Sequence, residues 1–221
     1  MKAKIIAVLN CKGGSAKTSV CMAISASLSQ RGNRVLVVDS DTQGSSLAWS
    51  AAAGKIPFPA TVISLASYGA KIHRELQRHV ENYDYILVDT PPSLEAPVNQ
   101  SVLFVAALCI IAQQSSPTDL WAARGVKTLI EFARTINPDL KACMVLTRVV
   151  RTSLSKAIMR ELESFGFPIL ATRMHNRTAY QEAAIAGSGV TTEALGRDAK
   201  AAADEVAGFT EEVLALLGDA S

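Results

Sequence analysis

The sequence of 221 residues predicts an α/β fold, with a doubly wound, mostly parallel sheet and helices on both of its faces. Short β-rich runs alternate with helical patterns along the whole chain, which is the order that parallel strands with crossover helices require. Two runs, at 34–39 and 84–89, each contain four consecutive apolar residues followed by an aspartate, as is typical of central strands buried on both faces. Since no repeat or linker interrupts the pattern, we expect residues 1–221 to form a single domain.

The expected elements follow in a regular order. Strands are expected at 4–10, 34–39, 61–65, 84–89, 108–113, 141–147 and 168–172. Helices are expected near 17–31, 45–53, 68–81, 95–107, 119–136, 153–165, 178–187 and 198–217. Ligands of such sheets bind at the carboxyl ends of the strands, so the loops that follow the strands are the expected position of a functional site.

Composition narrows the possible functions. The net charge of +2 is close to neutral, so any binding of nucleic acid must come from a local basic patch. The four cysteines are scattered without C-x-x-C spacing, which gives no support to a zinc, iron–sulfur or redox-pair site. No apolar run reaches the ~18–20 residues of a transmembrane helix. The first residues lead directly into a strand, so we expect no signal peptide and a cytoplasmic location.

The first expected strand runs into a loop suited to binding phosphate. Residues 11–19 read Cys-Lys-Gly-Gly-Ser-Ala-Lys-Thr-Ser and continue into a helix. Backbone N–H groups of such a turn converge on an anion, and the helix N-terminus adds partial positive charge. Lys17 would reach the outer phosphates, and the hydroxyl of Thr18 would ligate Mg²⁺. The nucleotide-binding residues expected here are Lys12, Gly13, Gly14, Ser15, Ala16, Lys17, Thr18 and Ser19.

The loop departs from the common pattern G-x-x-x-x-G-K-[ST], because Cys11 and Ala16 stand at its two glycine positions. It fits instead the variant K-G-G-x-x-K-[TS], and in this the chain resembles the ParA/MinD family of P-loop NTPases with a deviant Walker A loop. In that family the extra lysine, here Lys12, reaches the nucleotide of the partner chain across a dimer interface. The β-carbon of Ala16 could crowd a phosphate or resist a positive φ angle. We expect nucleotide binding to survive, with or without a loss of affinity.

Two of the expected strands end in aspartate at the same edge of the sheet. Asp39 and Asp41 follow the run at 34–39, and Asp89 ends the run at 84–89. Asp89 stands where a Walker B residue would hold Mg²⁺ directly or through water. The ParA family has a matching V-D-x-D-x-Q segment, and the resemblance implies that Asp41 positions the attacking water and that Asp39 lies near the metal. The alternative for each aspartate is an ordinary cap of a loop or helix.

The resemblance implies an ATPase that uses ATP and Mg²⁺, with Lys12, Lys17 and Asp41 as its catalytic residues. Phosphoryl transfer needs positioning and charge neutralisation more than covalent chemistry. Lys17 and Mg²⁺ would neutralise the β- and γ-phosphates, and Lys12 would act in trans as an arginine finger does. Hydrolysis would then be slow in the single chain and coupled to formation of a homodimer.

The resemblance extends toward the end of the chain, where residues 177–190 match the family pattern R-x-x-Y-x-x-A-x-x-x-G-x-x-V. The chain is most similar to the short, ParF-like branch. Thr147 and Arg148 end a strand at which family members contact the adenine base, so we include both among the nucleotide-binding residues. The guanidinium of Arg148 could serve the base, DNA or neither.

Family members differ in whether the dimer binds DNA or a membrane. The C-terminal segment at 204–219 is amphipathic but acidic, and anionic lipid would repel it, so we expect a helix packed on the domain and no membrane anchoring. The segment at 141–177 is more basic, and a dimer would double such a patch. The alternative is an ordinary solvated surface. The candidate DNA-binding residues are Arg148, Arg151, Lys156, Arg160, Arg173 and Arg177.

We therefore expect a ParA-type ATPase whose ATP-bound dimer binds nucleoid DNA without sequence preference. It would segregate or position a cargo, which could be a plasmid, a chromosome or a protein assembly such as a microcompartment. A ParB-like or other adaptor protein would stimulate hydrolysis. Two alternatives remain: a degenerate nucleotide-binding scaffold, and a metabolic ATP-dependent enzyme on the same fold.

Overall fold

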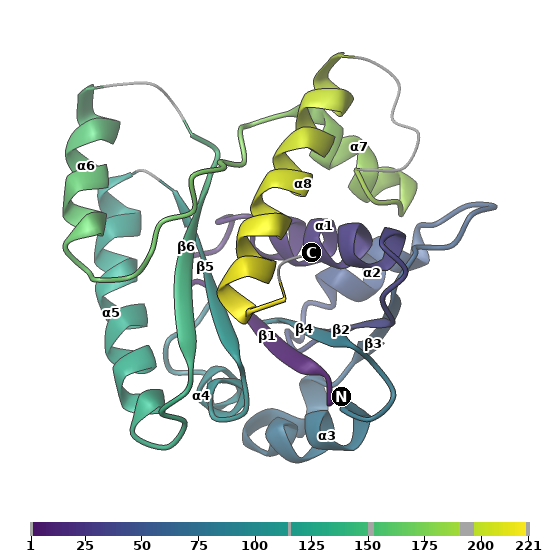
Figure 1. Ribbon diagram of the computed structural model, residues 1–221, viewed down its shortest axis with the longest axis horizontal. Coiled ribbons are helices and arrows are strands. Elements are labelled where there is room, and N and C mark those ends of the chain that lie inside the picture. The colour runs from purple at the N-terminus through teal and green to yellow at the C-terminus, as the bar shows by residue number, and fades with distance from the viewer. Residues whose placement is uncertain (1, 115, 150–152, 191–196, 220–221) are drawn as a thin grey trace.

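The computed structural model describes residues 2–114, 116–149, 153–190 and 197–219 (Figure 1). The described strands form one sheet in which every pairing is parallel, in the order β3-β2-β4-β1-β5-β6. They are β1 (Lys4–Leu9), β2 (Val35–Asp39), β3 (Thr61–Ser64), β4 (Tyr85–Asp89), β5 (Leu108–Gln114) and β6 (Lys141–Thr147). The predicted α/β class with a parallel sheet is confirmed.

Helices cover both faces of this sheet (Figure 1). One face carries α1 (Lys17–Gln30), α2 (Ser45–Ala51), α7 (Thr178–Ala186) and α8 (Arg197–Leu217). The other carries α3 (Ile72–His79), α4 (Pro97–Leu103), α5 (Pro117–Arg134) and α6 (Ser153–Glu163). A hydrophobic core lies on each side, as the doubly wound prediction requires.

The central strands are apolar over most of their length because each face of the sheet has its own core. Along β1, Ile6 and Val8 belong to the core under α1 and α8, whereas Ile5 and Ala7 belong to the core under α4 and α5. Successive side chains of a strand point to opposite faces, so a strand covered on both sides needs an apolar residue at every position.

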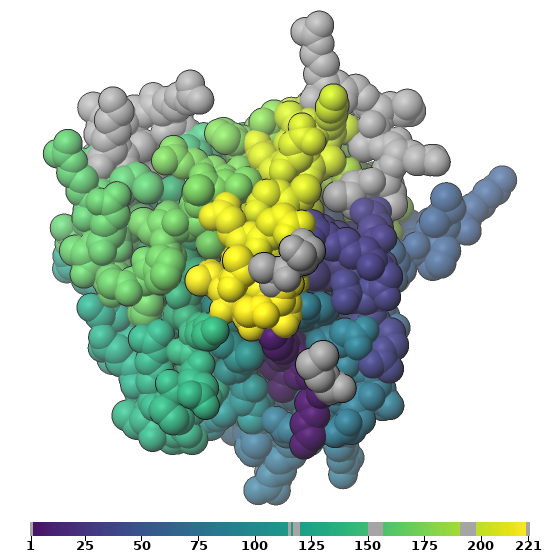
Figure 2. All heavy atoms as spheres, in the orientation of Figure 1, coloured from purple at the N-terminus to yellow at the C-terminus, as the bar shows by residue number. Residues whose placement is uncertain are grey.

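Helix α8 packs on the domain, as predicted from its acidic, amphipathic sequence. Its residues Val206, Phe209 and Val213 are fully buried in the core that it shares with α1. In the space-filling view, its atoms lie over the centre of the face turned to the viewer (Figure 2). In the part of the chain that the structure describes, no helix is long and apolar enough to span a bilayer.

The strand predicted at 168–172 is reduced to single bridges against the outer edge of β6. Leu170 N–H donates to the carbonyl of Met144 at 2.8 Å, as in a regular parallel ladder. The next ladder bond would join Thr172 N–H to Leu146, but Thr172 N–H donates instead to Glu212 Oε1 of α8, at 2.8 Å. Glu212 thus interrupts the ladder, which resumes where Met174 N–H donates to the carbonyl of Leu146 at 2.8 Å. Periodicity in the sequence could not show this interruption.

The helix predicted near 68–81 is split into two pieces. A 3₁₀ turn covers Ala66–Lys71, and α3 begins only at Ile72. Gly69 adopts φ 48° and ψ −127°, which is incompatible with a helix and which glycine adopts without a steric penalty.

Gly187 is the position where α7 meets α2, and it provides a test of the packing. Its φ is +62°, and a β-carbon there would lie 2.0 Å from the backbone nitrogen of Ala53. We predict that Gly187→Ala lowers the free energy of unfolding by about 2–4 kcal/mol, because it adds crowding against backbone to the cost of a left-handed alanine. Urea unfolding measures the loss.

Gly32→Ala is the matched control, since Gly32 has φ +86° and open space around its α-carbon. It should lose only about 1–2 kcal/mol, the cost of the left-handed conformation. Equal losses in the two variants would contradict the close contact between α7 and α2.

Candidate phosphate and metal site

The predicted site residues meet because the parallel strands end at one edge of the sheet. Asp89 of β4 is in register with Val8 of β1 on one side and with Asp39 of β2 on the other. At the end of β5 and β6, Gln114 is in register with Thr147. The loop after β1 and the aspartates therefore lie together, as the sequence predicted.

Side chains beneath the loop hold its backbone in place. Asn10 Nδ2 donates to the carbonyl of Ala112 at 2.5 Å, and Asn10 Oδ1 accepts the N–H of Lys12 at 3.1 Å. Gln114 Nε2 donates to the carbonyl of Gly14 at 2.6 Å. Because Ala112 and Gln114 both belong to β5, these hydrogen bonds attach the loop to the sheet and preorganise its backbone.

Thr147, predicted to contact the nucleotide, supports the loop from β6. Its side chain is fully buried, and its hydroxyl donates to the carbonyl of Ser15 at 3.0 Å. The hydroxyl of Ser15 is itself buried and makes no hydrogen bond with any described group. A direct contact of Thr147 with the base stays a prediction.

Lys17 begins α1 and lies across the loop. Its Nζ donates to the carbonyl of Lys12 at 3.3 Å. Burial lowers the pKa of the Lys17 ammonium, and the nearby carboxylates of Asp89 and Asp41 act in the opposite direction. An ammonium so placed, at the start of a helix, faces the position that phosphate oxygens take in loops of this type.

Asp89 and Thr18 form the corner where Mg²⁺ was predicted to bind, called here the metal corner. Its Oδ2 accepts the hydroxyl of Thr18 at 2.7 Å and that of Ser46 at 2.8 Å. Its Oδ1 is buried and makes no hydrogen bond with any described group. Burial raises the pKa of Asp89 to about 6. Mg²⁺ binds through one or two protein oxygens together with substrate phosphates, and the hydroxyl of Thr18 and the carboxylate of Asp89 fit that role.

Asp39 and Asp41 shape the loop that follows β2. Both oxygens of the fully buried Asp39 accept backbone N–H groups, from Asp41 at 3.1 Å and from Leu47 at 3.0 Å. Burial raises the pKa of Asp39. Asp41 is half-buried, and its Oδ1 accepts the N–H of Gln43 at 3.0 Å. Asp39 thus caps the loop, which was the alternative role considered for it. The role of Asp39 near the metal and that of Asp41 in positioning water stay predictions.

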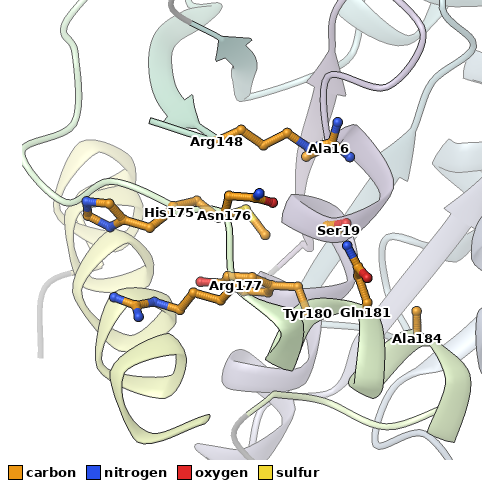
Figure 3. A pocket seen from close by; sticks show the side chains of 10 residues that line it. Ala16, Ser19, Arg148, His175, Asn176, Arg177, Tyr180, Gln181 and Ala184 are labelled. Atoms are coloured by element: carbon orange, nitrogen blue, oxygen red, sulfur yellow. The ribbon is translucent and has the colours of Figure 1, made fainter. Parts of the chain in front are cut away.

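A pocket opens beside the start of α1, where Ala16 and Ser19 line it (Figure 3). Arg148, at the end of β6, extends toward Ala16 from the opposite side. Asn176 and Gln181 are among the other lining residues, on the segment that leads into α7 and on α7 itself. The pocket adjoins the phosphate loop and lies where the nucleotide base was predicted to bind.

The basic residues predicted to bind DNA are not all available. Arg177 is tied to α8, because its Nη2 donates to Glu205 Oε1 at 2.6 Å and its Nη1 to Asp198 Oδ1 at 3.0 Å. Arg177 is also among the residues that line the pocket (Figure 3). Arg148, Arg160 and Arg173 are exposed. Arg151 and the side chain of Lys156 lie outside the described residues.

Sequence reasoning missed three residues of this site. Asn10 directly precedes the loop, so its position was a usable signal for a loop anchor. Gln114 and Ser46 carried no such signal, because each acts through a partner far away in the sequence: Gly14 for the first and Asp89 for the second.

The doubly wound sheet and the loop after β1 define a P-loop nucleotide-binding domain. Residues 6–190 match the CobQ/CobB/MinD/ParA nucleotide binding domain, and the chain belongs to this family. The predicted ParA/MinD membership is confirmed. The maintenance of carboxysome distribution protein A of Halothiobacillus neapolitanus is 36% identical over 214 residues, which cover 96% of this chain and 97% of that protein.

Solved structures show the same fold. A variant of McdA from Cyanothece in complex with ATP has a TM-score of 0.77 at 15% identity and covers 100% of this chain and 98% of its own. The cobyrinic acid a,c-diamide synthase of Mycobacterium smegmatis, with ADP and magnesium bound, has a TM-score of 0.66 at 24% identity and covers 84% of this chain and 91% of its own.

Ala16 carries the strain that its sequence position suggested, since it adopts φ 68° in the left-handed region. We predict that Ala16→Gly raises the free energy of unfolding by up to about 1 kcal/mol, because glycine removes a cost of about 1–2 kcal/mol and loses part of the gain to chain entropy. Ala207→Gly, at an exposed position inside α8, should instead lower it by about 0.5–1 kcal/mol. Urea unfolding of both variants measures these changes. A free energy of unfolding that falls in Ala16→Gly as it does in Ala207→Gly would contradict the strain at Ala16.

The raised pKa of Asp89 predicts how stability depends on pH. The folded chain holds the Asp89 proton up to about pH 6, whereas the unfolded chain releases it near 3.8, so the free energy of unfolding falls as pH rises between these values. Relative to Asp89→Asn, the wild type should lose roughly 2 kcal/mol between pH 4 and pH 7. Urea unfolding in EDTA without nucleotide measures it. A difference between the two proteins that does not vary with pH would contradict the burial of this carboxylate.

Proposed function

We propose that this chain is a ParA-type ATPase that binds Mg²⁺–ATP, dimerises in that state and uses the dimer to position a cargo on DNA. The observation that carries the proposal is the loop after β1, where Lys12 and Lys17 flank a glycine turn and Lys17 Nζ donates to the carbonyl of Lys12. The next residue, Thr18, donates its hydroxyl to Asp89. Cationic groups, backbone N–H donors and a metal corner are what a nucleoside triphosphate requires.

Each part of the site has a role in the proposed hydrolysis. The N–H groups of the loop and the ammonium of Lys17 bind and orient the phosphates. Thr18 and Asp89 would hold Mg²⁺, which supplies charge neutralisation when bound. Asp41 lies close enough to act on the charge of Lys17, and we assign it the attacking water. The pocket beside Arg148 takes the base.

Lys12 is assigned the role of a charge supplied in trans. Its backbone is fixed by Asn10, and its side chain lies half-buried at the loop. In this proposal its ammonium completes the site of a second copy of the chain, so hydrolysis is slow in the monomer and rises on dimerisation. The nucleotide then sets the oligomeric state.

The exposed arginines support a nonspecific DNA surface. Arg160 and Arg173 lie on α6 and on the segment before α7, and neither belongs to the ion-pair network that holds Arg177. A dimer doubles this positive surface, and affinity for DNA grows steeply with the number of phosphates neutralised. We propose a cytoplasmic, nucleoid-associated protein on this basis.

The cargo proposed here is a protein assembly of the carboxysome type. The support is the extent of the likeness to the carboxysome distribution protein of Halothiobacillus neapolitanus, which covers nearly the full length of both chains. An adaptor protein that stimulates hydrolysis would link the DNA-bound dimer to the cargo. A plasmid or chromosome is the alternative cargo, and it would use the same switch.

The proposal predicts a dimer that depends on ATP and a specific defect in Lys12→Ala. With Mg²⁺ and a non-hydrolysable ATP analogue, wild type should elute as a dimer by size-exclusion chromatography with light scattering, and as a monomer with ADP. Only the dimer should shift a nonspecific DNA duplex. Lys12→Ala should bind nucleotide within about threefold of wild type, yet hydrolyse at least about 100-fold more slowly, since a charge supplied in trans contributes 10³–10⁵ in related systems.

Lys71→Ala is the matched control, because Lys71 is an exposed lysine at the start of α3. Helix α3 packs on the face of the sheet opposite to α1, the helix that follows the loop. It should behave as wild type in every assay. A monomer in all nucleotide states would contradict the proposed switch, and a product other than ADP and phosphate would favour a metabolic enzyme on the same fold.

A further inference from the structure

Ser46 is a buried hydroxyl at the metal corner with no role in the predicted site. It lies in the first turn of α2 and is fully buried. Its Oγ donates to Asp89 Oδ2 at 2.8 Å, alongside the hydroxyl of Thr18 at 2.7 Å. A carboxylate of this kind aims its remaining lone pairs at a metal ion or at the water bound to it, so the groups that orient it affect the metal.

We propose that Ser46 is a positioning residue of the magnesium site, which fixes the carboxylate of Asp89 in the orientation that binds the metal. The inference rests on the proposed function, since it concerns the affinity of the same site for Mg²⁺. With Oδ2 held by two hydroxyl donors, the rotation of the carboxylate is restricted, and the buried Oδ1 is the oxygen left without a partner among the described groups.

The position of Ser46 also makes α2 a link between the metal corner and the base pocket. At its start, α2 is held by Ser46 on Asp89 and by the N–H of Leu47 on Asp39. Near its end, Trp49 Nε1 donates to the carbonyl of Ser188, just beyond α7, at 3.0 Å. Since α7 lines the base pocket, a change in the orientation of Asp89 is transmitted through one short helix to the base.

The test measures the Mg²⁺ dependence of nucleotide affinity, not turnover. A fluorescent ATP analogue is titrated against the full chain over a range of Mg²⁺ concentrations and in EDTA. In Ser46→Ala, the Mg²⁺ concentration that gives half of the gain in affinity should rise about tenfold, because loss of an outer-shell partner typically costs 10–100-fold in metal affinity. Affinity in EDTA should stay within about twofold of wild type.

Ser50→Ala provides the matched control on the same helix. The hydroxyl of Ser50 donates to the carbonyl of Leu47 at 2.9 Å and does not reach the metal corner. Its removal makes the same chemical change in α2, and the Mg²⁺ dependence should equal that of wild type. A merely structural effect on α2 would move both variants alike, and would also change the affinity in EDTA.

A second readout follows the link through Trp49. The chain has two tryptophans, and Trp49 is buried whereas Trp121 is exposed, so Trp121→Phe leaves Trp49 as the single reporter. Addition of Mg²⁺ to the nucleotide complex should change the fluorescence of Trp49, and Ser46→Ala should reduce that change by at least half. Ser50→Ala should retain it.

The outcomes separate the two proposals. If wild type shows no effect of Mg²⁺ on nucleotide affinity, the proposed Mg²⁺–ATP function is overturned together with this inference. If wild type depends on Mg²⁺ and Ser46→Ala has the same Mg²⁺ midpoint as Ser50→Ala, only the assignment of Ser46 is overturned.

Discussion

The arrangement of the site depends on the carboxylate of Asp89, which accepts hydrogen bonds from two hydroxyl groups. Thr18 brings the start of α1, and with it the phosphate loop, to the end of the central strand β4. Ser46 brings α2 and the loop after β2 to the same oxygen. One buried carboxylate thus joins the segments proposed to bind phosphate and metal, and the parallel register places it between the ends of β1 and β2.

The site is arranged for a ligand at some cost in stability. Burial raises the pKa of Asp89 to about 6, Ala16 is held at φ 68°, and the hydroxyl of Ser15 is buried without a described partner. Each of these features opposes folding by itself, and such features gather at functional sites, where the surrounding structure maintains them. Here the two hydrophobic cores and the six described strands supply that support.

The sequence was sufficient to predict the fold class and the phosphate loop, because both depend on local patterns. Apolar strands that end in aspartate and a glycine loop before a helix can be recognised without tertiary information. The contacts that depend on tertiary packing could not be found this way. Glu212 interrupts the ladder at Thr172 and Ser46 donates to Asp89, and the two residues of each pair lie far apart in the sequence. The pairing of Arg177 with Glu205 was hidden for the same reason.

The most direct test of the account is a crystal structure of the chain with Mg²⁺ and a non-hydrolysable ATP analogue. The account predicts phosphates within the loop at 12–18, Mg²⁺ at Thr18 and Asp89, and the base in the pocket beside Arg148. It also predicts a second copy of the chain whose Lys12 contacts the γ-phosphate. A nucleotide bound elsewhere, or a metal ion held without Thr18 and Asp89, would contradict the account.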